Sequence, residues 1–430
     1  MRERLPSAET ADLVHLPAMV ARARTAAAAL RTLSADEKTQ ALQRLAGLLV
    51  AETDGLLAAN TQDLAGADTT GRRAAIMDRL ALTRERIHAM AEGVRTVAAL
   101  PDPIGELIEV HQRPNGMRVG RMRVPIGVIL MIYEARPNVT IDAAALCVKA
   151  GNAAILRGGR EARHSNAYLG GLLGKVGLPE GAVQVIADSD HALVTALLGA
   201  DGIDLVIPRG GERLIRSVVE HARMPVLKHF KGACHLFVDR DADLAMAQRV
   251  TLNAKVQRPS TCNALETLLV DAPIASAFLP GMIPALRDAG VEVHACPRTR
   301  EIVAAGDPNL ARGLRPATDA DWGAEYLDLV LGIRVVDGLD DALTHIQQHS
   351  TGLADGIVTE NQDRARRFVA AVDSAAVLVN ASTRLVDGAE FGLGAEIGIS
   401  TDRIGPRGPM GVAELTSLKW VVLGTGQVRE

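Results

Sequence analysis

Short apolar segments alternate with helical segments from Pro125 onward, and this alternation limits the possible folds more than any other feature of the chain. Continuously apolar strands that alternate with helices predict a parallel sheet covered by helices on both faces, a doubly wound α/β fold. Such folds bind nucleotides beyond the carboxyl ends of their strands. The predicted strands and helices are, in order, Ile126–Tyr133, Val139–Ala150, Ala153–Leu156, Ser165–Lys175, Val183–Ile186, Ala192–Leu198, Ile203–Ile207, Glu212–Ala222 and Val226–Leu227.

A second α/β series follows from Ala233 onward, and a chain of 430 residues is too long for one hydrophobic core. We predict that the helix Ala275–Ala289 breaks at Pro280-Gly281, because proline disrupts a helix interior. Residues 10 to 100 are predicted to be almost entirely helical, with a capping box at Ser34 and Glu37. The other predicted elements of the second series are Ala233–Val238, Leu244–Val256, Leu265–Val270, Val291–His294, Leu329–Val335, Leu339–Gln347, Gly356–Val358, Gln362–Val372 and Ala376–Val379.

A predicted β-hairpin lies outside both series. Asn115-Gly116 joins the extended segments Glu106–Arg113 and Met117–Val124, which is a strong hairpin pattern. The hairpin is too rich in arginine to be a buried strand pair, so we expect it to project and to need a partner. Thr416–Leu423 is predicted as the final strand of the chain.

The composition argues against several classes of protein. Aromatic residues make up 2% of the chain and the net charge is −4, which disfavours nucleic-acid binding. No run of 18 apolar residues is present, and the N-terminal residues lack the apolar core of a signal peptide, so we expect no membrane association. The four cysteines are far apart, which favours reduced thiols in the cytoplasm over a disulfide framework.

Cys262 is the first candidate catalytic residue. It lies in the polar loop Ser260–Asn263, between a predicted helix and a predicted strand. Arg258 and Lys255 precede it closely, and nearby cations favour the nucleophilic thiolate. The alternative is a half-buried structural cysteine, since most free cysteines are inert core residues.

Two glycine-containing loops follow strands of the first series. Arg209, Gly210 and Gly211 precede a helix, so backbone amides there could bind a phosphate; the alternative is an ordinary tight turn. Arg157 ends the second strand beside Gly158 and Gly159, a position that suits an adenosine ribose or its 2′-phosphate, unless Arg157 is simply a surface arginine.

Asn138 follows the first strand of this series, and its amide could hold a developing oxyanion. The alternative, which does not exclude the first, is that Asn138 caps the following helix. The other cysteines are predicted to be structural. His294 and Cys296 form a pair with metal-like spacing, but without a second pair we assign no metal.

Longer motifs connect the chain with a family. They are RPSTCNALETLLV around Cys262, Val124–Cys147, Gly151–Gly159, His349–Glu360, Val379–Arg384, Phe391–Thr401 and Arg407–Val422. In all of them the chain resembles γ-glutamyl phosphate reductases of the aldehyde dehydrogenase superfamily. The resemblance implies an NADPH-binding domain with a Rossmann-type fold and a helical N-terminal part (residues 1–105 and 125–232). It also implies a catalytic domain (233–400) and a small β oligomerisation element (106–124 and 401–430).

The activity that the resemblance implies is NADPH-dependent reduction of L-glutamate 5-phosphate to L-glutamate 5-semialdehyde, the second step of proline synthesis from glutamate. The Cys262 thiolate would form a thioester and release phosphate. The resemblance also implies a homodimer or a dimer of dimers, and it leaves a transient contact with glutamate 5-kinase open.

Further site residues follow from the same resemblance. Glu325 is similar to a glutamate that contacts the nicotinamide ribose in relatives. Where acid-forming relatives carry a water-activating glutamate, this chain has Lys228–Gly232, which contains no carboxylate and so favours a reductase. Arg136 competes with Asn138 for the oxyanion position. The predicted substrate-binding residues are Arg136, Ser260, Thr261, Ser382, Thr383 and Arg384, with Arg384 a candidate partner for the substrate α-carboxylate.

Overall fold

The computed structural model describes residues 8–66, 77, 79–134, 136–186 and 191–429. The chain forms two compact units. Unit 1 contains Met1–Lys228, Gly392–Gly398 and Met410–Glu430, and unit 2 contains His229–Phe391 and Ile399–Pro409. Each unit has its own parallel sheet, so both predicted α/β series are confirmed.

The sheet of unit 1 has four parallel strands in the order β5-β4-β3-β6. Ile129 and Met131 of β3 belong to one core, whereas Val128 and Leu130 belong to another. The strand therefore alternates between two buried faces, as expected for a sheet covered on both sides. The elements are β3 (Val128–Tyr133), α6 (Pro137–Lys149), β4 (Ala153–Arg157), α7 (Arg163–Leu173), β5 (Val183–Ile186), α8 (His191–Leu198), β6 (Leu205–Arg209) and α9 (Glu212–His221).

The predicted strand Val226–Leu227 is wrong as a full strand. Val226 forms a single isolated bridge with Val206 of β6, and no ladder continues from it. The bridge consists of two hydrogen bonds, from the Val206 amide to the Pro225 carbonyl and from the Leu227 amide to the Val206 carbonyl, both at 3.0 Å. Pro225 has no amide hydrogen to donate, so the ladder does not extend before Val226.

The N-terminal helices cover both faces of this sheet. They are α1 (Ala8–Leu30), α2 (Ala35–Ala51), α3 (Thr53–Gly66) and α5 (Arg84–Ala99). The predicted capping box is confirmed: the Ser34 amide donates to Glu37 Oε2 at 2.8 Å, and the Glu37 amide donates to Ser34 Oγ at 3.2 Å. Helices α2 and α5 pack in the same core as α6, and α1 packs in the core on the other face.

The sheet of unit 2 has seven parallel strands in the order β10-β9-β11-β8-β7-β12-β13. Its strands are β7 (Cys234–Val238), β8 (Leu265–Asp271), β9 (Glu292–Ala295), β10 (Arg315–Pro316), β11 (Val330–Val336), β12 (Ala354–Val358) and β13 (Ala376–Val379). Its helices are α10 (Leu244–Val256), α11 (Ala272–Asp288), α12 (Pro297–Gly306), α13 (Pro308–Arg312), α14 (Leu339–His349) and α15 (Gln362–Ala371). The short strands β14 (Ile399–Ser400) and β15 (Gly408–Pro409) pair with each other.

The predicted break in α11 is wrong, because the helix continues through Pro280 and Pro284. One face of α11 is fully apolar and packs in the core of unit 2. Burial of that face outweighs the backbone hydrogen bonds that the two prolines remove. The residues of this face are Ala275, Phe278, Leu279, Met282, Ile283 and Leu286.

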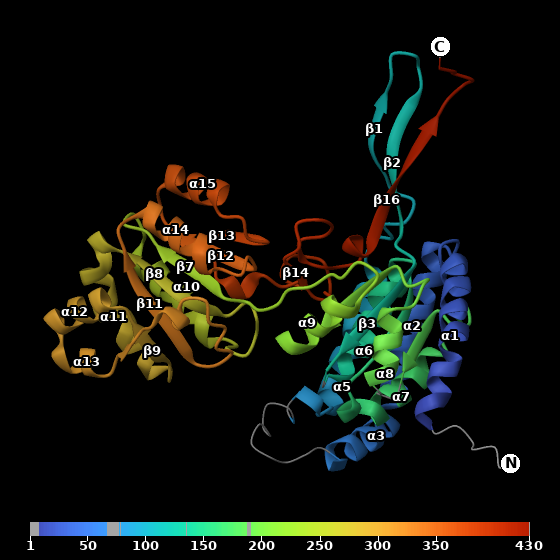
Figure 1. Cartoon of the computed structure of the whole chain (residues 1–430), viewed down its shortest axis with the longest axis horizontal. Coiled ribbons are helices and arrows are strands. Elements are labelled where there is room, and N and C mark those ends of the chain that lie inside the picture. Colours follow the sequence, from blue (N-terminus) through green and yellow to red (C-terminus); the bar gives the residue numbers. More distant parts are fainter. Residues whose placement is uncertain (1–7, 67–76, 78, 135, 187–190, 430) are drawn as a thin grey trace. The chain divides into compact units, whose positions relative to one another are not determined.

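The predicted hairpin and the predicted final strand are confirmed and form one sheet. Strand β1 (Leu107–Gln112) pairs with β2 (Arg118–Pro125), and β2 pairs with β16 (Thr416–Leu423) along the whole length of β16, all antiparallel. We call this sheet the arm. Figure 1 shows the arm extending away from the α/β body of unit 1. Several of its apolar side chains are exposed, with Trp420 at 68% and Val422 at 56%.

The structure contains no helix, within its described residues, that is long and apolar enough to cross a membrane.

Candidate active site

Cys262 lies on the loop between the end of α10 and the start of β8. The loop closes through a hydrogen bond from the Ala264 amide to the Thr261 carbonyl, at 3.0 Å. Thr261 Oγ1 lies 2.8 Å from the Arg258 carbonyl oxygen and 2.9 Å from Asn263 Oδ1. All four cysteines lie in the described part of the chain, and Cys262 is the one that is not buried. The sequence prediction placed this thiol on a loop, and that position is confirmed.

The start of β7 lies directly against the Cys262 backbone. A Cβ added to Gly232 would lie 1.8 Å from the Cys262 carbonyl oxygen, so only glycine fits there. Cys234 Sγ donates a weak hydrogen bond to the same oxygen at 3.4 Å. Burial raises the pKa of Cys234 well above its ordinary value, and it raises the pKa of Cys147 to about 12. Both thiols therefore stay protonated and unreactive, in agreement with the prediction that they are structural.

Arg384 contacts the Cys262 loop from the other side. Its Nε donates to Gln257 Oε1 at 2.8 Å, and its guanidinium group also donates to Asn263 Oδ1. The Arg384 amide donates to Ser382 Oγ at 3.3 Å, and Thr383 is buried between them. The structure thus brings the predicted residues 382–384 together with the Cys262 loop. Their roles in substrate binding stay predictions.

The Lys255 ammonium group is paired with a carboxylate and is not a free cation beside the Cys262 thiol. Its Nζ lies 2.7 Å from Glu266 Oε2, and both side chains are fully buried. Burial is the main cause that raises the pKa of Glu266 to about 7 and lowers the pKa of Lys255. The expectation that Lys255 favours the thiolate needs correction, because Glu266 balances its charge. Sequence spacing gave no sign of this pair, since the partner lies on the following strand.

Glu325 lies in unit 2 and is attached to the segment beside Cys262. Its Oε1 accepts a hydrogen bond from the Gly232 amide at 2.9 Å. Ser260 is exposed on the loop next to Thr261. The predicted site residues of unit 2 therefore lie on or against the Cys262 loop, except Glu325, which is hydrogen-bonded to Gly232, the residue that packs against the Cys262 backbone.

The predicted cofactor residues of unit 1 lie at one edge of its sheet. Arg157 pairs in register with Ile132 of β3, and Arg209 pairs with the next residue, Tyr133. The carboxyl ends of β4, β3 and β6 therefore place both arginines at the same edge. Burial lowers the pKa of Arg157, and the guanidinium group remains a cation at neutral pH.

The glycines at this edge mostly accommodate side chains of the chain itself. An added Cβ would lie 2.0 Å from Asn166 Nδ2 at Gly158, 2.1 Å from Glu161 Oε1 at Gly159, and 2.7 Å from the Glu134 carboxyl at Gly210. Gly211 has open space around it and caps α9 without a side-chain hydrogen bond.

The sequence prediction did not include Glu134. Its Oε2 accepts a hydrogen bond from the Gly211 amide at 3.1 Å. A carboxylate at this helix start disfavours a phosphate and suits a ribose hydroxyl. The position of Glu134 at the end of the first strand was the available signal.

Asn138 does not cap α6. The cap position belongs to Arg136, which makes no side-chain cap hydrogen bond, and α6 begins at Pro137. Asn138 lies within the first turn and donates from Nδ2 to Asp142 Oδ2 at 3.0 Å. The capping alternative is therefore wrong, because proline with its fixed φ begins the helix one residue earlier. The oxyanion role of Asn138 stays a prediction.

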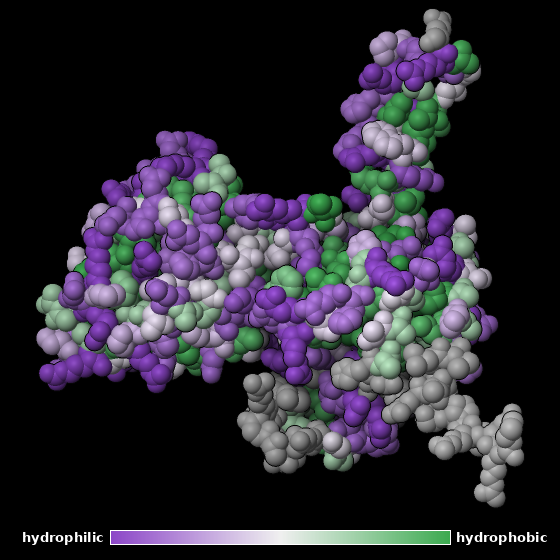
Figure 2. Space-filling view, viewed as in Figure 1, coloured by the Kyte–Doolittle hydropathy of each residue, from purple (hydrophilic) through white to green (hydrophobic). Residues whose placement is uncertain are grey.

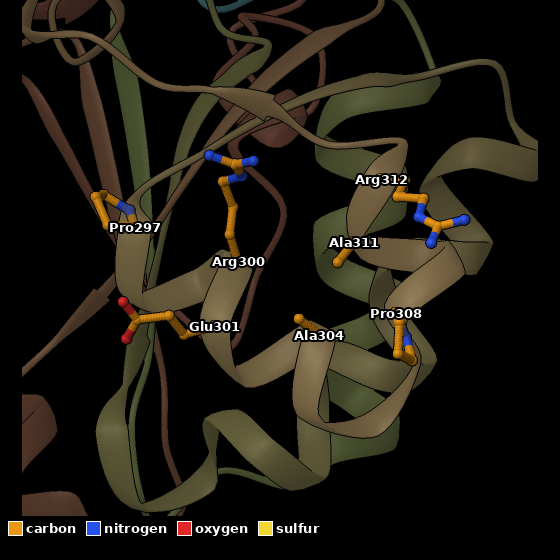
Figure 3. Close-up of a pocket in the computed structure, with 7 residues that line it drawn as sticks. All are labelled: Pro297, Arg300, Glu301, Ala304, Pro308, Ala311 and Arg312. Atoms are coloured by element: carbon orange, nitrogen blue, oxygen red, sulfur yellow. The ribbon is translucent and has the colours of Figure 1, made fainter.

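A shallow cavity of about 400 Å³ lies between α12 and α13 in unit 2. Figure 3 shows Ala304 and Ala311 lining the space between the two helices, with Arg300 and Arg312 extending in different directions. None of its lining residues is a predicted site residue, so the chemistry is better assigned to the Cys262 loop. Among the described residues, no group of three or more histidine, cysteine or carboxylate side chains is arranged to hold a metal ion.

Comparison with known proteins agrees with the motifs. The model of the aldehyde dehydrogenase family matches residues 2–300. A gamma-glutamyl phosphate reductase from Moorella thermoacetica is 51% identical over 414 residues, which are 95% of this chain and 97% of that protein. A solved gamma-glutamyl phosphate reductase from Thermotoga maritima is 45% identical with a TM-score of 0.92, over 97% of this chain and all of the other.

A more distant structure shows the same fold. An acetylating aldehyde dehydrogenase from Geobacillus thermoglucosidasius is 16% identical, with a TM-score of 0.70 over 99% of this chain and 100% of the other. The α/β architecture with two parallel sheets and an arm is thus the aldehyde dehydrogenase fold. The chain belongs to the aldehyde dehydrogenase family and, within it, to the gamma-glutamyl phosphate reductases.

Proposed function

We propose that this protein reduces L-glutamate 5-phosphate to L-glutamate 5-semialdehyde and phosphate with NADPH, as the second step of proline synthesis from glutamate. The observation that carries this proposal is the partly exposed Cys262 thiol, held on a loop that is built around it. The names of the closely related proteins, which cover nearly the whole chain, give the substrate class.

The Cys262 thiolate attacks the acyl carbon of the substrate, the bond from that carbon to the phosphate oxygen breaks, and phosphate leaves. The glutamyl group is then held as a thioester. Addition of hydride to the same carbon would give a thiohemiacetal anion. As its C=O bond re-forms, the C–S bond breaks, the aldehyde is released and the Cys262 thiolate is restored. We assign the oxyanion to Asn138, which has a second amide hydrogen besides the one donated to Asp142.

The edge of the unit 1 sheet fits NADPH, which supplies hydride when bound. Arg157 and Arg209 provide two cations for phosphate groups, and the Glu134 carboxylate provides an acceptor for a ribose hydroxyl. Gly211 provides open space at the start of α9. Gly158, Gly159 and Gly210 let the backbone pack closely around this edge. We assign Glu325 to the nicotinamide ribose on the basis of the family resemblance alone.

The chemical groups of the substrate are assigned to side chains of three segments: the Cys262 loop, residues 382–384 and the segment that contains Arg136. Arg384, with Ser382 and Thr383, is proposed to meet the substrate α-carboxylate, and Ser260 and Thr261 are proposed to line the approach to the thiol. Arg136 is proposed to contact the substrate phosphate. No carboxylate occurs between Lys228 and Gly232, the segment that reaches Cys262 through Gly232, which supports a thioester that is reduced and not hydrolysed.

The reverse reaction tests this function. We expect the protein, given NADP and the semialdehyde, to form NADPH only when phosphate is present, because phosphate must release the glutamyl group from the thioester. Absorbance at 340 nm, followed over a phosphate titration, measures this dependence. Arsenate serves as a positive control, since it replaces phosphate as the attacking anion. Equal rates with and without phosphate would indicate a hydrolytic dehydrogenase.

We also propose that the protein is cytoplasmic and assembles as a homodimer or a dimer of dimers through the arm. The arm exposes Trp420, Val422 and Leu423, and among the described residues its two edge strands, β1 and β16, each pair with β2 alone. Figure 2 shows apolar side chains along the arm. A transient contact with glutamate 5-kinase, which would hand over the unstable acyl phosphate, is part of the same proposal.

Charged substitutions on the arm test the assembly. We expect Trp420→Asp combined with Val422→Asp to convert the oligomer to single chains, because two carboxylates in an apolar interface stay unpaired. Light scattering after size-exclusion chromatography measures the mass. Val369→Asp is the matched control, because Val369 is 48% exposed on α15 in unit 2, outside both segments of the predicted oligomerisation element. An unchanged mass in the arm variant would contradict the proposal.

A further inference from the structure

The Glu325 carboxylate holds the backbone that lies against Cys262. Its Oε1 accepts the Gly232 amide at 2.9 Å, and Gly232 is so close to Cys262 that an added Cβ would lie 3.0 Å or less from three backbone atoms of Cys262. We propose that Glu325 is a positioning residue for the nucleophile: it fixes Gly232, and Gly232 fixes the peptide that carries the thiol. The inference rests on the proposed function, in which Cys262 is the nucleophile.

The remainder of this segment is held by other side chains, one residue after another. The Ala233 amide donates to Thr351 Oγ1 at 2.9 Å, and the His235 amide donates to Asp355 Oδ1 at 2.9 Å. Between them, Cys234 Sγ contacts the Cys262 carbonyl oxygen at 3.4 Å. Residues 232–235 thus form a fixed support for the loop, and Glu325 holds the end of that support that touches Cys262 most closely.

The segment that carries Glu325 is itself fixed by contacts with other elements. The Tyr326 hydroxyl donates to Asp321 Oδ1 at 2.6 Å, and the Leu327 amide points to Glu266 Oε1 at 3.4 Å. Leu327 has a φ of +55°, in the left-handed region that a leucine adopts only where its surroundings demand it. These contacts set the direction of the Glu325 side chain before any ligand binds.

Two other roles for Glu325 make different predictions. A ribose contact, as relatives imply, would act on cofactor affinity alone, and a general base would require a carboxylate. A positioning residue needs an acceptor for the Gly232 amide, which a glutamine carbonyl also provides. Glu325→Gln and Glu325→Ala therefore separate the three roles.

The test measures the alkylation of Cys262 by iodoacetamide in the absence of NADPH, followed by mass spectrometry of the peptide that contains Cys262. We expect Glu325→Ala to lower kcat about a hundredfold, because a small displacement of a nucleophile from its bound substrate has effects of this size. The alkylation rate constant should change at least about tenfold, because displacement of the Cys262 peptide alters the exposure and the thiolate fraction of its sulfur. Glu325→Gln should stay within about threefold of wild type in alkylation, since it keeps the acceptor. Gly232→Ala should behave like Glu325→Ala, because its Cβ collides with the Cys262 carbonyl.

Glu301→Ala is the matched control, since Glu301 is exposed on α12, and it should match wild type. Circular dichroism shows whether each variant is folded. If Gly232→Ala does not fold, the two Glu325 variants are enough to test the proposal. An unchanged alkylation rate in Glu325→Ala would overturn the proposal, and a raised KM for NADPH in that case would assign Glu325 to the cofactor. A wild-type protein that is alkylated but does not reduce the acyl phosphate would refute the proposed function alone.

Discussion

Replacing Cys262 by alanine should lower the rate of acyl-phosphate reduction by at least about a thousandfold, because no other group can form the thioester. The loss should appear in kcat, measured as NADPH oxidation at 340 nm. NADPH binding should stay within about threefold of wild type, since the predicted cofactor residues Arg157 and Arg209 lie in unit 1 and Cys262 lies in unit 2. Fluorescence titration with NADPH measures this second quantity.

Cys296→Ser is the matched control for this experiment. Cys296 is buried in the same unit, and its sulfur accepts the Thr299 amide at the start of α12. Serine is a preferred residue at the N-cap position that Cys296 occupies, so α12 should keep its cap. The enzyme should therefore keep its activity. A Cys262→Ala variant that reduced the substrate at a near-normal rate would contradict the mechanism. Loss of activity in both variants would point to a general effect of replacing a cysteine in unit 2.

The parts of this fold that could be predicted from the sequence are those where local chemistry determines the outcome. The strands of both sheets are continuous apolar segments, and a buried parallel strand needs such a segment along its whole length. The arm turns through Pro114, Asn115 and Gly116, closed by a hydrogen bond from the Arg113 amide to the Met117 carbonyl, and Gly116 has a φ of +83°, which glycine adopts easily. Cys262 was placed on a loop because Pro259 cannot continue α10.

Other parts could not be predicted because they depend on residues far apart in the sequence. Nothing near Gly232 indicates that it touches Cys262, and nothing near Lys255 indicates that it faces Glu266 on the next strand. Local rules failed where tertiary burial was stronger, as in α11, which keeps two prolines in its interior. Helices α12 and α13 were not predicted, although each begins at a proline, which favours the first turn of a helix.

Lys255→Met should destabilise unit 2 by about 3–5 kcal/mol, because it leaves the Glu266 carboxylate buried without its cation. Both side chains of this pair are fully buried, and the atoms Nζ and Oε2 lie 2.7 Å apart. Trp322 is 6% exposed in unit 2, so its fluorescence in a Trp420→Phe background reports the unfolding of this unit in urea. Arg366→Met breaks an exposed ion pair with Asp363 and should cost less than about 1 kcal/mol.

The same substitution should make stability depend on pH in a definite direction. Burial already raises the pKa of Glu266 to about 7, and removal of the Lys255 cation should raise it further. A carboxyl whose pKa is higher in the folded state than its ordinary 4.5 binds its proton more tightly when folded. Its stabilising effect is complete below pH 4.5 and is lost as the pH rises through the folded value.

Lys255→Met should therefore cost more stability at pH 8 than at pH 5.5, where Glu266 can stay protonated. Lys255→Met combined with Glu266→Leu removes the remaining charge, so the free energy of unfolding should return to within about 2 kcal/mol of the parent and should lose the pH dependence that Glu266 contributes. Equal costs at both pH values in the single variant would show that Glu266 is solvated or finds another cation. Because Glu266 also accepts the Leu327 amide at 3.4 Å, the double variant should in addition change the alkylation rate of Cys262 through the segment that directs Glu325.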